Sequence, residues 1–204
     1  PRKPVDGSPE WAKLGRSYVN HTGSIFDMAY YLANQHVLAC WLKNKWRTTA
    51  NFICAQHLGV DWDNETPESD PSVVSKIKLV QNCGSILYTT QSHRPEAPRC
   101  RVVFVTDRPE SDPAKHRRRV RALAWMMGAD KACTDPARAF YGTGDNGLVE
   151  VIGGLMIAAN FGTRLAAFAR GKRGDVIAHG FQAVVFVIHS AIHARNGFDI
   201  RVIA

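Results

Sequence analysis

The chain has 204 residues, 45% of them hydrophobic, and a formal net charge of +8 at pH 7 with an isoelectric point near 9.5. This length supports one large domain, or a domain with an appended subdomain, and the basic balance favours polyanionic partners, nucleic acid first. The five cysteines are odd in number and lack C-x-x-C spacing, which argues against a disulfide framework and a zinc ribbon. We therefore expect free thiols, a cytoplasmic location and no bound zinc.

Membrane segments are not expected. No charged n-region followed by an apolar h-region opens the chain, so we expect no signal peptide. Residues 176–194 lack Asp, Glu, Lys and Arg, but their three histidines, glutamine and serine make a poor spanning helix. A buried or partner-facing helix is the better interpretation of that stretch.

The first part of the chain predicts a helical unit. Residues 1–24 are polar and rich in Pro, Gly and Ser, so we expect a loosely ordered lead-in. Over residues 25–46 apolar side chains recur at helical spacing behind Ser24, a suitable N-cap, which predicts an amphipathic helix. Residues 51–55 could begin a further helix.

The next part alternates between strands and helices, whose ends are marked by Pro and Gly. We expect a strand at 58–63, a helix at 68–84, strands at 85–91 and 100–107, a helix at 112–128 and a strand at 138–143. This strand-helix-strand-strand-helix-strand order predicts an α+β fold with an RRM-like or ferredoxin-like antiparallel sheet. Its first and third strands would be central, with the fourth strand beside the first and both helices on one face.

The chain therefore divides into three parts: the lead-in at 1–24, a core at 25–147 and a C-terminal helical extension at 148–204. The extension holds two helical patterns, at 148–169 and 176–194, which are joined by a basic turn, "RGKRGD".

Two acids follow an apolar run in "VDWD". If this is a strand, Asp61 and Asp63 point to one face, while Val60 and Trp62 point to the other. Carboxylates this close repel each other unless a divalent cation lies between them, and Mg²⁺ and Mn²⁺ take such oxygen ligands. The alternative is a polar turn, because acids before Asn64 are common there.

Two further segments carry polar side chains at the ends of expected elements. "QSHRPEAPRCRVVF" places His93 where a strand ends and clusters Arg99 and Arg101 at the following hairpin, where they could grip phosphate or form a solvated rim. "ADKACTDPARAFYGT" supplies two possible ligands, Asp130 and Asp135, and places Arg138 at the start of the expected fourth strand. Asp135 precedes a proline and could equally cap a turn. In a split fold that strand neighbours the first, so a third carboxylate could reach the Asp pair.

These three segments resemble the motifs of the archaeo-eukaryotic primase superfamily, of the primase-polymerase kind found in plasmids, phages and related mobile systems. The resemblance covers residues 47–144. Its second motif is Ser-x-His, and here the position two before the histidine is Gln91, with Ser92 adjacent instead.

The resemblance implies a magnesium- or manganese-dependent nucleotidyltransferase, a DNA primase or DNA polymerase. It would use two metal ions and act on nucleoside triphosphates and a single-stranded or primed DNA template. The implied metal ligands and catalytic residues are Asp61, Asp63 and Asp130. The implied nucleotide-binding residues are Ser92, His93, Arg99, Arg101 and Arg138. Template-binding candidates in the extension are Arg164, Arg170, Lys172 and Arg173. A larger polypeptide, or replication or CRISPR machinery, could hold such a domain.

Two other interpretations remain open. A non-catalytic RRM-like module that binds single-stranded nucleic acid would need aromatic side chains on its central strands, for which Phe104 is a candidate. The basic run at residues 115–121 could grip the template backbone or form a solvated outer helix face.

Overall fold

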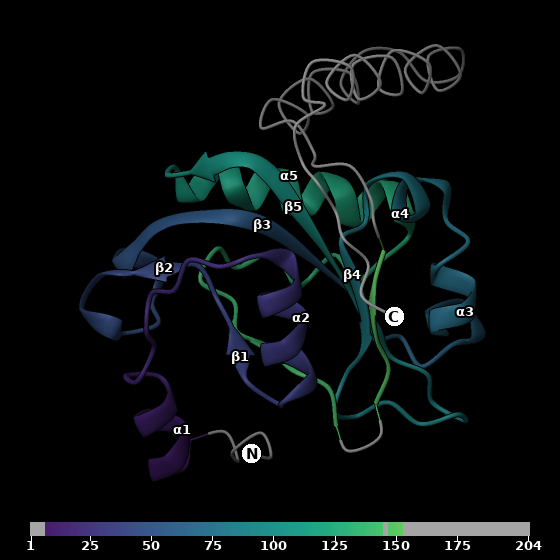
Figure 1. Ribbon diagram of the computed structural model, residues 1–204, viewed down its shortest axis with the longest axis horizontal. Coiled ribbons are helices and arrows are strands. Elements are labelled where there is room, and N and C mark those ends of the chain that lie inside the picture. Colours follow the sequence, from purple (N-terminus) through teal and green to yellow (C-terminus); the bar gives the residue numbers. More distant parts are fainter. Residues whose placement is uncertain (1–6, 145–146, 153–204) are drawn as a thin grey trace.

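The computed structural model describes residues 7–144 and 147–152, which form a mixed α+β fold with antiparallel sheets (Figure 1). The helices are α1 (Pro9–Leu14), α2 (Ile25–Ala33), α3 (Pro71–Val74), α4 (Lys78–Cys83) and α5 (Pro113–Met127), with 3-10 turns η1 (Lys43–Lys45), η2 (Thr49–Asn51) and η3 (Pro67–Ser69). The strands are β1 (Val37–Leu38), β2 (Trp41–Leu42), β3 (Phe52–Trp62), β4 (Ile86–Thr89), β5 (Cys100–Glu110), β6 (Phe140–Tyr141) and β7 (Val149–Val151). Among the described residues, no helix has both the length and the apolar character that a bilayer crossing requires.

The main sheet has five strands in the order β2-β3-β5-β4-β7, and β1 pairs separately with β6. All of these pairings are antiparallel. The long strands β3 and β5 lie inside the sheet, as expected for the first and third strands of the predicted unit. Their register places Asp61 opposite Arg101, and β4 places Tyr88 opposite the same arginine.

Helices cover both faces of this sheet (Figure 1). On one face, α3, α4 and α5 pack on a core that includes Val60, Trp62 and Phe104. On the other face, α2 packs on Ile86, Tyr88 and Val103. The strands carry apolar side chains on both faces because helices cover both faces. Polar side chains at the strand ends are therefore the candidates for a functional site.

Helix α5 has the boundaries that its sequence predicts. The Asp112 side chain accepts hydrogen bonds from the backbone of Ala114 and Lys115, and Gly128 ends the helix in the left-handed conformation at φ 68°. In its basic run, Arg119 is buried, with its Nη2 atom 2.8 Å from Glu110 Oε2. The helix lies on the sheet face opposite Asp61, which favours the outer-face interpretation of its exposed arginines.

Several expected helices are shorter than predicted. The segment 25–46 begins with a capping box between Ser24 and Asp27, but its helix ends at Ala33, and the chain turns through Gln35 at φ 62°. Strands β1 and β2 follow. Leu42 of β2 packs into a small core beside β3, and this packing would be lost if the helix continued through residue 42. The lead-in contains α1, residues 52–55 belong to β3, and the 68–84 helix is divided into α3 and α4.

The prediction for the fourth strand is also wrong. Of residues 138–143, only Phe140 and Tyr141 form a strand, which pairs with β1, while β2 takes the place beside β3. The reason is a close approach at Gly59, where an added Cβ would lie 2.4 Å from Phe140 Cζ. Because Gly59 has no side chain, the Phe140 ring can lie across β3, and the backbone of this segment pairs with β1 instead of adding a strand beside β3.

The C-terminal extension is described only at its start. Residues 149–151, expected to be helical, form β7 on β4. The rest of the helical patterns at 148–169 and 176–194 lies outside the described residues, together with Arg164, Arg170, Lys172 and Arg173.

Candidate active site

The acid pair lies at the end of β3, in the orientation that strand alternation predicts. Asp61 is 2% exposed, Asp63 is half-buried, and Trp62 between them points into the core on the other face. Burial raises the pKa of Asp63, and the negative charges of Asp130 and Asp61 raise it further. The three predicted carboxylates therefore lie close enough to repel one another.

Asp61 is held by two arginines. Arg101 Nε donates a hydrogen bond to Oδ1, and Arg138 Nη2 lies 2.8 Å from Oδ2. Burial acts to raise the pKa of Asp61, but the positive charges of Arg101 and Arg138 outweigh it and hold the pKa below its ordinary value. Asp61 is thus a buried, ionised carboxylate with both oxygens facing cations.

Arg101 is enclosed by the same cluster. Its Nη1 atom donates to Tyr88 Oη at 2.8 Å and to the Tyr141 carbonyl at 3.3 Å, and its guanidinium lies 4.9 Å from the centre of the Phe140 ring. The donors of this side chain therefore already contact Asp61, Tyr88 and the Tyr141 carbonyl inside the sheet, so it is poorly placed for the nucleotide contact that the sequence suggested.

Asp130 reaches the acid pair through the turn after α5. Its backbone N–H donates to the Asp61 carbonyl at 2.9 Å, which ties this turn to the end of β3. Its Oδ1 atom accepts from the Ala132 backbone at 2.8 Å, and its Oδ2 atom accepts from Cys133 Sγ at 2.6 Å. The fourth strand was expected to bring a third carboxylate here, but the turn does so instead.

Cys133 is a site residue that sequence reasoning missed. Donor atoms of Asp63, Asp130 and Cys133 all lie within 4.8 Å of one another. Burial raises the pKa of the Cys133 thiol, and its hydrogen bond to Asp130 raises it further. The available signal was the spacing of Cys133 three residues after a candidate ligand, where a turn brings the two side chains together.

This donor set fits a divalent cation. A cation between Asp63 and Asp130 would relieve the repulsion that raises the pKa of Asp63, and carboxylate oxygens suit Mg²⁺ and Mn²⁺. A thiol is a softer donor, which Mn²⁺ tolerates better than Mg²⁺. Since both oxygens of Asp61 face arginines, Asp61 lies beside this group of donors and is not part of it.

Basic side chains flank the acids. The charges of Arg99 and Arg138 act to lower the pKa of Asp63, so both lie near its carboxylate. Arg99 also pairs with Glu65, and Arg138 is the more exposed partner of Asp61. Both arginines could therefore meet an anionic substrate that approaches Asp63.

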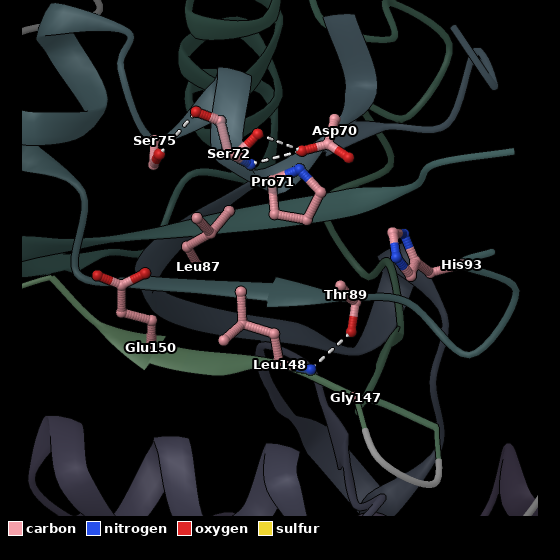
Figure 2. A pocket seen from close by; sticks show the side chains of 10 residues that line it. All are labelled: Asp70, Pro71, Ser72, Ser75, Leu87, Thr89, His93, Gly147, Leu148 and Glu150. Carbon is pink, nitrogen blue, oxygen red and sulfur yellow. Dashed lines mark hydrogen bonds between the residues drawn. The ribbon is translucent and has the colours of Figure 1, made fainter. Parts of the chain in front are cut away.

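His93 lies on the hairpin between β4 and β5 and contacts the backbone of Arg99. The backbone N–H of Arg99 donates to His93 Nδ1 at 3.1 Å, while Ser92 is exposed. His93, Asp70, Leu87 and Leu148 are among the residues that line a hollow of about 450 Å³. Figure 2 shows His93 and Asp70 at one end of this lining. The hollow runs between the start of α3 and the β4–β7 edge.

Comparisons with known proteins give one distant similarity. No family model matches the chain, and no curated protein is similar to it. Among solved structures, the AEP domain of the cyanophage S-2L primase-polymerase (PrimPol) is similar with a TM-score of 0.44 and 13% sequence identity. The match covers 59% of this chain and 64% of that chain, and at this distance it assigns no function.

Proposed function

We propose that the protein is a DNA-templated nucleotidyltransferase, a primase or a primer-extending polymerase. The observation that carries the proposal is the convergence of Asp61, Asp63 and Asp130 at one end of the central strands, with Arg99 and Arg138 beside them. Carboxylates that repel one another beside partly exposed arginines suit a site for metal ions and a triphosphate.

Asp63, Asp130 and Cys133 are the residues that would hold a metal ion. When bound, two Mg²⁺ or Mn²⁺ ions would neutralise the triphosphate and ease deprotonation of a primer 3′-hydroxyl. Asp61, whose two oxygens face Arg101 and Arg138, would hold these two guanidinium cations beside the metal donors from its buried position. Arg101 is a positioning residue, because it keeps Asp61 ionised and fixed without reaching solvent.

Arg99, Arg138 and His93 would bind the triphosphate. Because His93 Nδ1 accepts a hydrogen bond from a backbone N–H, the neutral ring carries its proton on Nε2, which can then donate to a phosphate oxygen. The Arg99 backbone thus fixes the tautomer of the histidine, while its side chain lies near Asp63. Ser92 is close in sequence, and its exposed hydroxyl could add a further contact.

The binding-only alternative has lost its stacking candidate. An RRM-like module reads bases with aromatic side chains exposed on central strands, but Phe104 is 0% exposed and packs in the core beneath the helices. The acidic cluster would also repel the phosphates of a bound strand unless cations were present.

Primer extension and de novo synthesis on single-stranded DNA, with Mg²⁺ or Mn²⁺, test the proposal. Asp63→Asn and Asp130→Asn should each reduce incorporation by at least about a hundredfold while the protein stays folded, because each removes a metal ligand. Glu96→Gln, which neutralises an exposed acid on the hairpin, should leave incorporation unchanged. Incorporation that survives both aspartate substitutions would overturn the assignment.

A further inference from the structure

A second basic and aromatic surface lies outside the candidate active site. The segment 41–47, "WLKNKWR", leaves Trp41 41% exposed and Trp46 48% exposed. Between these indoles the η1 turn presents Lys43 and Lys45, and Lys45 has a left-handed φ of 58°. We call Trp41, Lys43, Lys45, Trp46 and Arg16 the tryptophan–lysine surface.

The two indoles are held in place although their rings are exposed. Trp41 Nε1 donates to the His21 carbonyl at 3.1 Å, and the Arg16 guanidinium lies 5.3 Å from the centre of the Trp46 ring. The Tyr18 backbone N–H donates to the Lys45 carbonyl at 3.3 Å, which anchors the turn itself. A ligand that stacks on these rings would lose little of its binding energy to ordering them.

The two segments that carry these rings are mainly basic, and Asp135 of a distant segment lies 4.0 Å from Arg47 at their border. Segments 7–21 and 41–51 contain five lysines and arginines, Lys13, Arg16, Lys43, Lys45 and Arg47, against one acid, Glu10. Exposed aromatic rings among basic side chains fit single-stranded nucleic acid, whose bases stack while its phosphates meet the cations. A protein partner fits less well, because lysine is depleted at protein–protein interfaces. A duplex would not offer unstacked bases to the indoles.

A chain of contacts through one short turn links this surface to the candidate active site. Arg47, next to Trp46, donates from Nη1 to the Ala137 carbonyl at 3.2 Å. Arg138, which follows Ala137 in the chain, pairs with Asp61. Thr49 donates from Oγ1 to Asp135 Oδ1 at 3.0 Å, which fixes the same turn. A strand lying on the tryptophan–lysine surface would therefore lead toward the acids.

We propose that the tryptophan–lysine surface binds the single-stranded DNA template, with bases stacked on Trp41 and Trp46 and phosphates on Lys43, Lys45 and Arg16. The choice of a DNA template as occupant rests on the proposed function. The binding itself requires neither metal ions nor nucleoside triphosphates, so it can be measured apart from catalysis.

The test is binding of a fluorescent oligo-dT strand to the full chain without metal ions or triphosphates, over a series of salt concentrations. Trp46→Ala should weaken binding by at least about fivefold, the loss of one base–aromatic stack. Lys43→Gln with Lys45→Gln should lower the slope of log affinity against log salt by about 1.4, the loss of two phosphate contacts to a single strand. Circular dichroism verifies that each variant is folded.

Matched controls come from the exposed residues of α5. Trp125→Ala removes an indole that is also exposed, and Arg117→Gln with Arg118→Gln removes two exposed charges. Both should bind the strand as the wild type does. Unchanged binding in the surface variants, or equal losses in the α5 controls, would overturn the inference, as would equally strong binding of a duplex that depends on Trp46.

The two proposals fail in distinguishable ways. If the wild type incorporates no nucleotides but Trp46→Ala still loses strand binding, the proposed function fails and the surface stands. If the wild type polymerises and the surface variants bind the strand normally, the surface assignment alone is wrong.

Discussion

Replacing Arg101 by methionine tests whether its pairing with Asp61 holds the candidate site together. Both residues are buried, so solvent screens their interaction little. Methionine keeps much of the side-chain length without the charge, and it would leave Asp61 facing only the more exposed Arg138. Removing one partner of a buried ion pair costs about 3–5 kcal/mol, whereas an exposed pair contributes about 0–1 kcal/mol. We expect the larger loss of unfolding free energy at neutral pH.

This loss should depend on pH with a definite sign. In the wild type the folded-state pKa of Asp61 lies below its unfolded value, so its stabilisation is present above the unfolded pKa of about 3.9 and is lost as pH falls through the folded pKa. Without Arg101, we expect burial to dominate and raise the folded-state pKa above the unfolded value. The charged carboxylate then destabilises the variant at neutral pH, and protonation relieves that penalty as pH falls.

Urea unfolding followed by circular dichroism, at neutral pH and near pH 4, measures both effects. The difference between wild type and variant should shrink on acidification, and Asp61→Asn combined with Arg101→Met should be more stable than Arg101→Met at neutral pH. Lys115→Met, which removes a more exposed cation from Glu110, is the matched control and should cost under about 1 kcal/mol. A loss below about 1 kcal/mol for Arg101→Met, or one independent of pH, would refute the reasoning.

Two further predictions concern the metal donors and the buried histidines. In calorimetric titration, Cys133→Ser should lower Mn²⁺ affinity by about tenfold and Mg²⁺ affinity by less than about twofold, because only the softer ion gains from the thiol. Cys54→Ser is the control. Equal effects of Cys133→Ser on both ions would contradict a Cys133 ligand. Burial lowers the pKa of His57 to about 3 and of His116 to about 4, so their contribution to stability is present above the unfolded pKa of about 6.5 and falls as pH drops toward those values. Replacing either histidine by leucine should reduce the slope of unfolding free energy against pH in acid by up to about 1.4 kcal/mol per pH unit. His21→Leu, at an exposed position, should leave this slope unchanged. An unaltered slope in both buried variants would show that neither histidine governs the loss of stability in acid.

Local sequence signals correctly predicted the ends of helices that begin or end at a capping residue. Asp112 and Gly128 bound α5, and Ser24 begins α2, because caps act within one turn of the residue that supplies them. The same signals failed over residues 34–46, where helical spacing of apolar residues competed with the small core around Leu42. That core is built from β2, β3 and the 137 region, so no local window contains it.

The strand phase of β3, with Asp61 and Asp63 on the face opposite Trp62, follows from the amino-acid order, because side-chain alternation is a property of the extended backbone. The residue pattern left Asp130 and Asp135 as candidate partners for that pair, and the family resemblance pointed to Asp130. Three contacts appear only in the folded chain: Arg101 pairs with Asp61, Cys133 lies beside Asp63 and Asp130, and Phe140 crosses β3 at Gly59. Those contacts depend on strand register and on how a turn packs against a distant strand, and both are fixed by the whole fold.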